Sequence, residues 1–111
     1  ITHYLNYAAL LTDLHDTKRA FSVLQKLAHI IKEANSDTCL DYAQVQESMG
    51  NLFLLTANLP KANIHYMKAL EIYKNIWNDN PDLIDKKYQE IQELYLQAGL
   101  MPGKRILDFQ K

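Results

Sequence analysis

The chain resembles itself when it is shifted by 42 residues, and this internal period limits its possible folds more than any other feature. Under this shift Ala20 falls on Ala62, and Phe53 falls on Tyr95. A fixed period that returns small residues and aromatics at the same phase is typical of a repeat array. Each repeat is one supersecondary unit that cannot bury its apolar face alone. The period therefore predicts stacked units that share one core and leave a long curved surface.

Apolar residues recur at the three- and four-residue spacing of amphipathic helices, and no alternating strand pattern is present. Asp16 or Thr17 can cap the second helix, and Asn78–Pro81 is the strongest break. Pro60 suits a first helical turn and Gly99 a helix end. The predicted helices cover residues 1–14, 17–34, 39–57, 60–77 and 81–98, and a short last helix opens at Pro102. We therefore predict three antiparallel helix pairs in a single all-α domain over residues 1–111.

Each predicted helix carries one apolar face, which we expect to form the core. In the first pair this face comprises Tyr4, Tyr7, Ala8, Leu11, Leu14, Ala20, Leu24, Leu27, Ala28 and Ile31. In the others it comprises Val45, Met49, Leu52, Phe53, Ala62, Tyr66, Ala69, Leu70, Tyr73, Ile76, Leu83 or Ile84, Tyr88, Ile91, Leu94, Tyr95 and Ala98. Trp77 ends a helix beside this stripe, where it either covers the junction between repeats or anchors a partner.

The composition is that of a globular domain, with 48% apolar and 23% charged residues and a formal net charge of −1. Because no block of Lys or Arg dominates, we expect neither nucleic acid nor a membrane surface as a partner. No apolar run approaches the ~20 residues that span a bilayer. The single cysteine, Cys39, excludes an intrachain disulfide and favours a reducing, cytoplasmic setting. The chain opens with Ile1 near the start of a repeat, so we expect a fragment of a longer protein.

The residue types that carry catalysis or bind metals do not occur in useful patterns. The histidines are His3, His15, His29 and His65. None of them has a second histidine four residues away, and none has metal-ligand spacing to the cysteine. Glu90 and Glu93 share a helix face, but solvated charge explains this pair better than acid–base catalysis. No Gly-rich loop is present to hold a phosphate. The sequence therefore predicts no enzyme activity, no metal site and no cofactor.

The central segment MGNLFLLTANLPKANIHYMKALEIY, residues 49–73, resembles a tetratricopeptide repeat. Gly50, Ala62 and Ala69 stand where that family places small residues at the crossing of its two helices, and Tyr66 matches a large position. Small residues are needed there because two helices pack closely only where the crossing point lacks bulk. The resemblance implies a solenoid of helix pairs that winds as a right-handed superhelix.

The usual repeat of this family is 34 residues long, and the longer period here resembles the repeats of kinesin light chain. The repeats are expected over residues 1–38, 39–80 and 81–111. The third match is weak, because Lys104 replaces a small residue and Asp108 replaces an aromatic. This last helix is interpreted either as a polar terminal cap or as a boundary that cuts a repeat.

The resemblance also implies that the first helix of each pair lines a concave groove. The family's groove positions map onto Leu5, Asn6, Ala9, Thr12 and Asp13, then Gln44, Glu47, Ser48, Asn51, Leu54 and Leu55, and finally Lys86, Gln89, Glu90, Glu93 and Gln97. Amides in this set both donate and accept hydrogen bonds, which suits an extended peptide. A solvated helix surface is the alternative at each single position. The Lys/Asn/Arg clamp of some chaperone adaptors is missing, so chaperone-tail binding is not expected.

These features predict a scaffold module that binds a protein or peptide segment through its concave groove. A first alternative is a regulatory sensor domain within a larger protein of the same family. A second is self-association, because the open end of the first repeat exposes apolar surface that a homodimer would bury.

Overall fold

The computed structural model describes residues 2–13, 16–34 and 38–109 of the chain. The helices are α1 (Thr2–Asp13), α2 (Thr17–Glu33), α3 (Leu40–Leu55), α4 (Leu59–Ile76), α5 (Pro81–Gln97) and α6 (Lys104–Leu107). These described ranges contain no strand, and the all-α prediction is confirmed. Each of the five longer helices begins and ends within two residues of its predicted bounds. We call α1, α3 and α5 the first helices and α2, α4 and α6 the second helices of their pairs.

Side-chain caps or a proline mark the starts of α2, α4 and α5. The Asp16 carboxylate accepts a hydrogen bond from the Arg19 backbone N–H at 3.4 Å, so Asp16 rather than Thr17 caps α2. Asn58 caps α4 in the same way, through the backbone N–H of Lys61. Pro81 is the first residue of α5, where its missing N–H has no helical partner to lose.

Gly99 ends α5, as its position in the sequence predicts. Its φ of 72° lies in the left-handed region that favours glycine. The N–H of Leu100 donates to the carbonyl oxygen of Tyr95 at 2.9 Å, which satisfies a carbonyl group left open at the helix end. The chain therefore turns sharply after α5 and returns toward α4.

The last helix differs from the prediction because it is short and begins later. Pro102 is buried instead of opening the helix, and α6 covers only Lys104–Leu107. A helix this short gains little from its own hydrogen bonds, so tertiary contacts determine its place. Ile106 is fully buried in the core, and the Tyr88 hydroxyl donates to the Leu107 carbonyl oxygen at 3.1 Å. The third helix pair is therefore incomplete compared with the first two.

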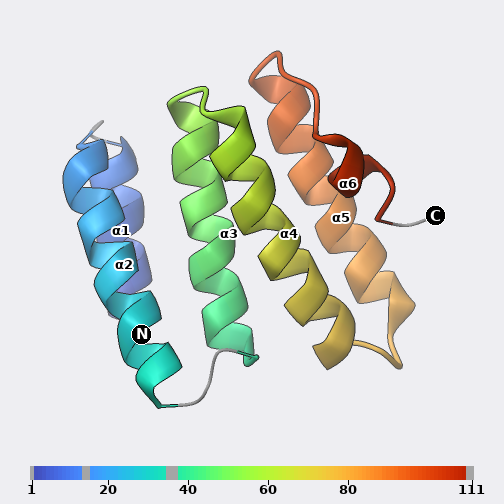
Figure 1. The fold of residues 1–111 in the computed structure, drawn as a ribbon, viewed down its shortest axis with the longest axis horizontal. Helices are drawn as coiled ribbons and strands as arrows, with labels where there is room; N and C mark the ends of the chain where they lie inside the picture. The colour runs from blue at the N-terminus through green and yellow to red at the C-terminus, as the bar shows by residue number, and fades with distance from the viewer. Residues whose placement is uncertain (1, 14–15, 35–37, 110–111) are drawn as a thin grey trace.

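The helices lie side by side in chain order, as Figure 1 shows. Each long helix packs on the next, and α1 also contacts α3. In the same view α2 lies in front of α1 and α6 in front of α5, whereas α4 lies beside α3. The molecule measures 36 × 35 × 19 Å, a flat shape that fits an open stack of helix pairs rather than a closed bundle.

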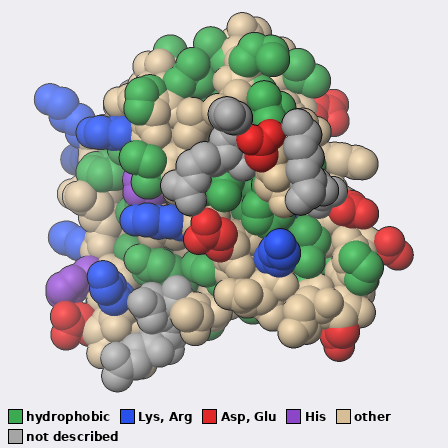
Figure 2. All heavy atoms as spheres, turned by 45° about the vertical axis from the view of Figure 1, so that its right-hand side comes forward, with side chains coloured by type: hydrophobic (Ala, Val, Ile, Leu, Met, Phe, Trp, Pro, Cys, Tyr) green, Lys and Arg blue, Asp and Glu red, His purple; other side chains and the backbone are tan. Residues whose placement is uncertain are grey.

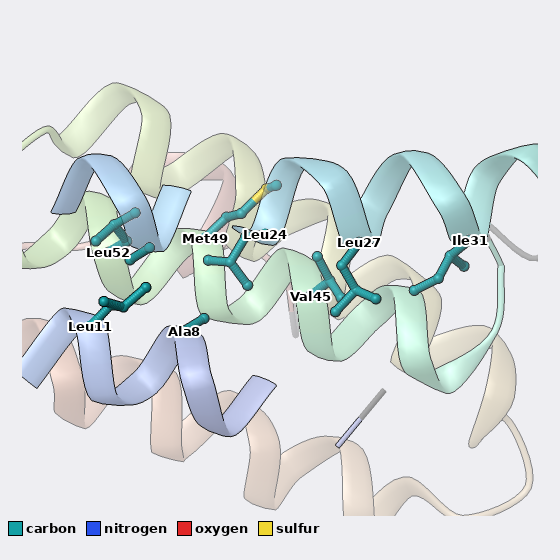
Figure 3. Packing of buried hydrophobic residues seen from close by; sticks show 9 residues of the cluster. Ala8, Leu11, Leu24, Leu27, Ile31, Val45, Met49 and Leu52 are labelled. Carbon is teal, nitrogen blue, oxygen red and sulfur yellow. The ribbon is translucent and has the colours of Figure 1, made fainter. Parts of the chain in front are cut away.

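The first part of the core lies between α1, α2 and α3. Figure 3 shows side chains from these three helices pointing toward one another. The buried residues are Ala8, Leu11, Ala20, Leu24, Leu27, Ile31, Val45, Met49 and Leu52. All nine belong to the apolar faces that the sequence predicts, and the first repeat therefore shares its core with the second.

The second part of the core lies between α3, α4, α5 and α6. Its buried residues are Leu54, Ala62, Tyr66, Met67, Leu70, Tyr88, Ile91, Tyr95 and Ile106. The small residue at the α3–α4 crossing is essential to this packing. A Cβ atom added to Gly50 would lie 2.7 Å from the ring of Tyr66, which is closer than atoms can approach without displacement. The predicted close crossing is confirmed.

A smaller cluster joins α3 and α4 near the junction with the third pair. Ala43, Ala69 and Tyr73 are buried there. Trp77 is half-buried and stacks on Tyr73 with 4.7 Å between ring centroids. Trp77 therefore packs on the α3–α4 cluster of its own repeat, and its role as a junction cover or a partner anchor stays a prediction.

Tyr7 is not a core residue, contrary to the prediction. Its side chain is 47% exposed, because it lies on the outer side of α1, where no further helix covers it. It borders a hollow of about 210 Å³ with Val23 and Ile30 of α2. The side chain of Tyr4 and the whole of Leu14, also expected in the core, lie outside the described part of the structure.

Three further core predictions fail near the helix ends. Ile76 is 37% exposed and Ala98 is exposed, since each lies in the last turn or just after it, beyond the neighbouring helix. Of the two alternatives in α5, Leu83 is exposed and Ile84 is half-buried. A helical period places residues on a face, but it does not say where the facing helix stops.

Candidate functional site

The first helices border two adjoining hollows on their side of the molecule. The first hollow, of about 320 Å³, is lined by Leu5, Asn6, Gln44, Glu47, Ser48, Tyr73 and Lys87. The second, of about 280 Å³, is lined by Ala8, Ala9, Thr12, Leu24, Ser48, Asn51 and Leu94. Because Ser48 borders both hollows, they form one continuous depression, which we call the groove. It brings together residues of α1, α3 and α5, with contributions from α2 and α4.

The predicted groove residues of the first two repeats converge on this depression. Those that line it are Leu5, Asn6, Ala9, Thr12, Gln44, Glu47, Ser48 and Asn51. Leu55 is 47% exposed and lines neither hollow. The side chain of Asp13 lies outside the described part of the structure. The expectation for Leu54 is wrong, because it is only 7% exposed and packs in the core against α4 and α5.

The third repeat contributes different residues from those expected. The predicted positions Lys86, Gln89, Glu90, Glu93 and Gln97 are exposed on α5 and line neither hollow. Lys87 and Leu94 line the groove instead. These two lie seven residues apart and therefore on one face of α5. The predicted Lys86 and Glu93 have the same separation, so spacing within the helix could not have distinguished the two faces.

Lys87 reaches from α5 to α3 and forms the most connected polar group in the groove. Its ammonium lies 3.2 Å from the Glu47 carboxylate and 3.3 Å from that of Glu90. It also lies over the ring of Tyr73, 5.2 Å from the centroid. The Tyr73 hydroxyl donates to Glu47 at 2.8 Å, so the hydroxyl and the ammonium meet at the same carboxylate.

The protonation of this group follows from its surroundings. Burial acts to lower the pKa of Lys87, but the carboxylates of Glu47 and Glu90 outweigh it and raise the pKa above its ordinary value. Burial, followed by the charge of Glu47, raises the pKa of the Tyr73 hydroxyl. At neutral pH the groove therefore holds the Lys87 ammonium beside a neutral Tyr73 hydroxyl.

Asn51 lines the second hollow, and a hydrogen bond holds its side chain in place. Its side-chain oxygen accepts a hydrogen bond from the Tyr66 hydroxyl. The neighbouring wall is apolar, with Ala8, Leu24 and Leu94. The groove thus combines an oriented amide with space for an apolar side chain.

A polar pair between α3 and α4, in which Gln46 is buried and His65 is half-buried, was not predicted. Gln46 is 3% exposed, and its side-chain oxygen lies 2.7 Å from Nδ1 of His65 on α4. The His65 ring stacks on Phe53, with centroids 5.4 Å apart. Burial, followed by the charges of Lys68 and Lys61, lowers the pKa of His65 to about 4. The position of Gln46 between the buried Val45 and Met49 was the available signal for its burial.

Neither a metal centre nor a membrane-spanning helix is evident among the residues that the structure describes. No three His, Cys, Asp or Glu side chains come together there as metal ligands would. None of the described helices is long and apolar enough to cross a bilayer.

Comparison with known proteins identifies one match. A family model described as tetratricopeptide repeat matches residues 1–75, which contain α1, α2, α3 and nearly all of α4. No curated protein and no solved structure matches the chain. The specific likeness to kinesin light chain stays a prediction.

Proposed function

The chain belongs to the tetratricopeptide repeat family, and on this basis we propose that it binds an extended segment of a partner protein in its groove. Repeats of this family mediate protein–protein interaction. A non-catalytic scaffold role therefore follows most directly from the family. A cytoplasmic setting, expected from the single cysteine, is part of the same proposal.

The chemistry of the groove is the observation that carries this proposal. Asn6, Gln44 and Asn51 place side-chain amides along its length. An extended peptide has backbone groups that neither a helix nor a sheet satisfies, and amides can both donate to and accept from them. Leu5 and Leu94 add apolar surface for side chains of the partner.

The rigidity of the walls supports the same proposal. The groove residues stand on helices whose opposite faces are buried in the two main core clusters. A preformed groove loses less conformational entropy on binding than a mobile loop, and more of the contact energy then appears as affinity.

The test is a pull-down that measures how much of each partner protein is recovered by the parent protein and by two matched variants. The groove variant carries Asn6→Ala, Gln44→Ala and Ser48→Ala. The control variant carries the same residue types on the second helices, as Asn75→Ala, Gln25→Ala and Ser22→Ala, all exposed. We expect the groove variant to lose specific partners that the parent and the control retain. Equal recovery by all three proteins would reject the groove as the binding site.

Self-association is a second candidate, favoured by the outer hollow beside α1 and α2. Tyr7, Leu10 and Ile30 are large apolar residues there or close by, each about half exposed or more. Ile30→Lys should remove any concentration-dependent dimer seen by sedimentation; a parent that sediments as a monomer at all concentrations rejects this candidate. The regulatory-sensor alternative requires an effector segment that this sequence does not contain.

A further inference from the structure

The nearly neutral net charge hides a division of charge between the first helices and the helices α2 and α4. The first helices carry the described acidic residues Asp41, Glu47, Asp82, Asp85, Glu90 and Glu93, against the basic Lys86 and Lys87. The helices α2 and α4 carry the basic residues Lys18, Arg19, Lys26, Lys32, Lys61, Lys68 and Lys74, against Glu33 and Glu71. The groove is lined mainly by residues of the acidic first helices, Glu47 among them.

Figure 2 shows the same division on the surface. In this view Lys and Arg side chains gather on the left, and Asp and Glu are frequent along the right-hand edge. Opposite charges on opposite sides create a field that orients a charged partner as it approaches. A basic segment is drawn toward the first helices, whereas an acidic one is drawn toward α2 and α4.

Lys87 shows how a cation sits in the groove. Its ammonium is held between the carboxylates of Glu47 and Glu90 and over the ring of Tyr73. The side chains of Lys87 and Glu47 are only 21% and 18% exposed, so water screens this ion pair less than a surface pair. Lys87 faces two carboxylates, that of Glu47 in the hollow and that of Glu90 on the exposed surface beside it.

The first hollow offers room for a second cation beside Lys87. It measures about 320 Å³ and opens onto Glu47. Asn6, Gln44 and Ser48, whose side chains carry oxygen atoms, also border it. Such oxygens accept hydrogen bonds from an ammonium or a guanidinium group. The adjoining second hollow, with its apolar wall, suits an apolar residue next to the basic one.

From these observations we propose that the groove selects a basic partner segment, whose Lys or Arg side chain binds in the first hollow against Glu47 and Tyr73. This inference rests on the proposed function and adds the chemical class of the partner. An apolar side chain of the same segment fills the second hollow. Lys87 competes with the incoming cation for Glu47, because both need the same carboxylate.

Three capped peptides test the proposal, namely GSLKRLSG, GSLQQLSG and GSLEELSG, each titrated into the labelled protein while amide chemical shifts are recorded at low salt. We expect the basic peptide to shift resonances of α1, α3 and α5 and to bind about tenfold more tightly than the neutral one. Its affinity should fall as salt is added. The acidic peptide should not shift groove resonances.

Two substitutions sharpen this test because their effects have opposite signs. Glu47→Gln retains an oxygen that accepts from Tyr73 but removes the charge, so basic-peptide affinity should fall about tenfold. Lys87→Gln removes the internal competitor, so the affinity should rise several-fold. General damage to the fold would weaken binding in both variants. Glu33→Gln, an exposed glutamate on α2, is the control and should leave the affinity unchanged.

Each contrary result has a distinct meaning. Equal groove binding of the basic and neutral peptides overturns the charge selectivity and leaves the proposed groove function standing. Shifts confined to α2 and α4, weaker binding by Lys87→Gln, or no binding of the basic peptide also overturn this inference. The proposed function itself is decided by the matched alanine variants described above.

Discussion

Gly50 and Tyr66 depend on each other where α3 crosses α4. The ring of Tyr66 occupies the space that any side chain at position 50 would need. Tyr66 is itself fully buried, and its hydroxyl is bonded to Asn51. The ring therefore cannot move aside without breaking that bond or leaving a cavity, which makes this pair the most sensitive point of the fold.

We expect Gly50→Leu to destabilise the protein by about 1–3 kcal/mol through overpacking. Tyr66→Ala should cost about 3–5 kcal/mol by opening a cavity. The double variant should lose less than the sum of the two, because the truncated residue leaves room for the leucine. Denaturant unfolding measures all three values. Ala9→Leu, at an exposed position of α1, is the control for adding a leucine. If the stability losses of the two single variants simply add in the double variant, Gly50 and Tyr66 do not depend on each other.

His65 makes stability depend on pH in a defined direction. Its pKa is about 4 in the folded protein and 6.5 in the unfolded chain, so the unfolded chain binds the proton more readily. The contribution of neutral His65 to the free energy of unfolding is complete above about pH 6.5 and decreases as the pH drops toward 4. The ring is half-exposed, and we therefore expect a loss of about 1 kcal/mol after allowance for screening.

The measurement compares thermal unfolding of the parent and His65→Gln between pH 7 and pH 4.5. Glutamine keeps an amide group near Gln46 but does not titrate, so this variant should lose less stability on acidification than the parent. His29→Gln serves as the control, because His29 is an exposed residue paired with Glu33 on α2. Identical pH profiles for the parent and His65→Gln would refute this assignment.

At the scale of whole helices, the N-terminus of α2 depends on one carboxylate. Asp16 accepts from the backbone N–H of Arg19 and also lies 3.7 Å from the Arg19 side chain. Asp16→Ala should therefore cost about 1 kcal/mol, as is usual for the loss of an N-cap. Thr17→Ala is the matched control and should cost less than half as much. Chemical unfolding measures the loss of stability in both variants. A larger loss for Thr17→Ala would show that Asp16 is not the capping residue.

The sequence predicted helices well because their signals are local. Periodic apolar residues, the prolines and Gly99 lie within the segments whose structure they determine. The short α6 could not be predicted in the same way, since contacts of Ile106 and Leu107 with distant helices define it. A local pattern carries no information about which distant surface is available to cover it.

The candidate site was predictable only where the groove positions of the repeat family fall on the same helix face in this chain. Asn6, Gln44 and Ser48 line the groove as expected. In α5 the groove positions of the family indicated Lys86, but Lys87 lines the groove. A difference of one residue rotates a helical side chain by about 100°, so the packing of α5 on its neighbours decides which of these lysines faces the groove.

For the molecule as a whole, α3 is the helix on which both main core clusters depend. It contributes Val45, Met49 and Leu52 to the first cluster and Leu54 to the second. Hydrogen exchange should therefore be slowest in α3 and in α4 that packs on it, and faster in α1 and α6 at the two ends. Exchange in α3 as fast as in α1 would show that the pairs open independently.

The bridge from Lys87 to Glu47 links the third repeat directly to the second across the binding surface. The second core cluster also joins α5 to α3, α4 and α6. An incoming cation that captured Glu47 would release Lys87, and α5 would lose this polar link to α3 while keeping its apolar contacts. A cation bound in the groove would then loosen the third repeat, so that the loss of one ion pair changes the position of α5.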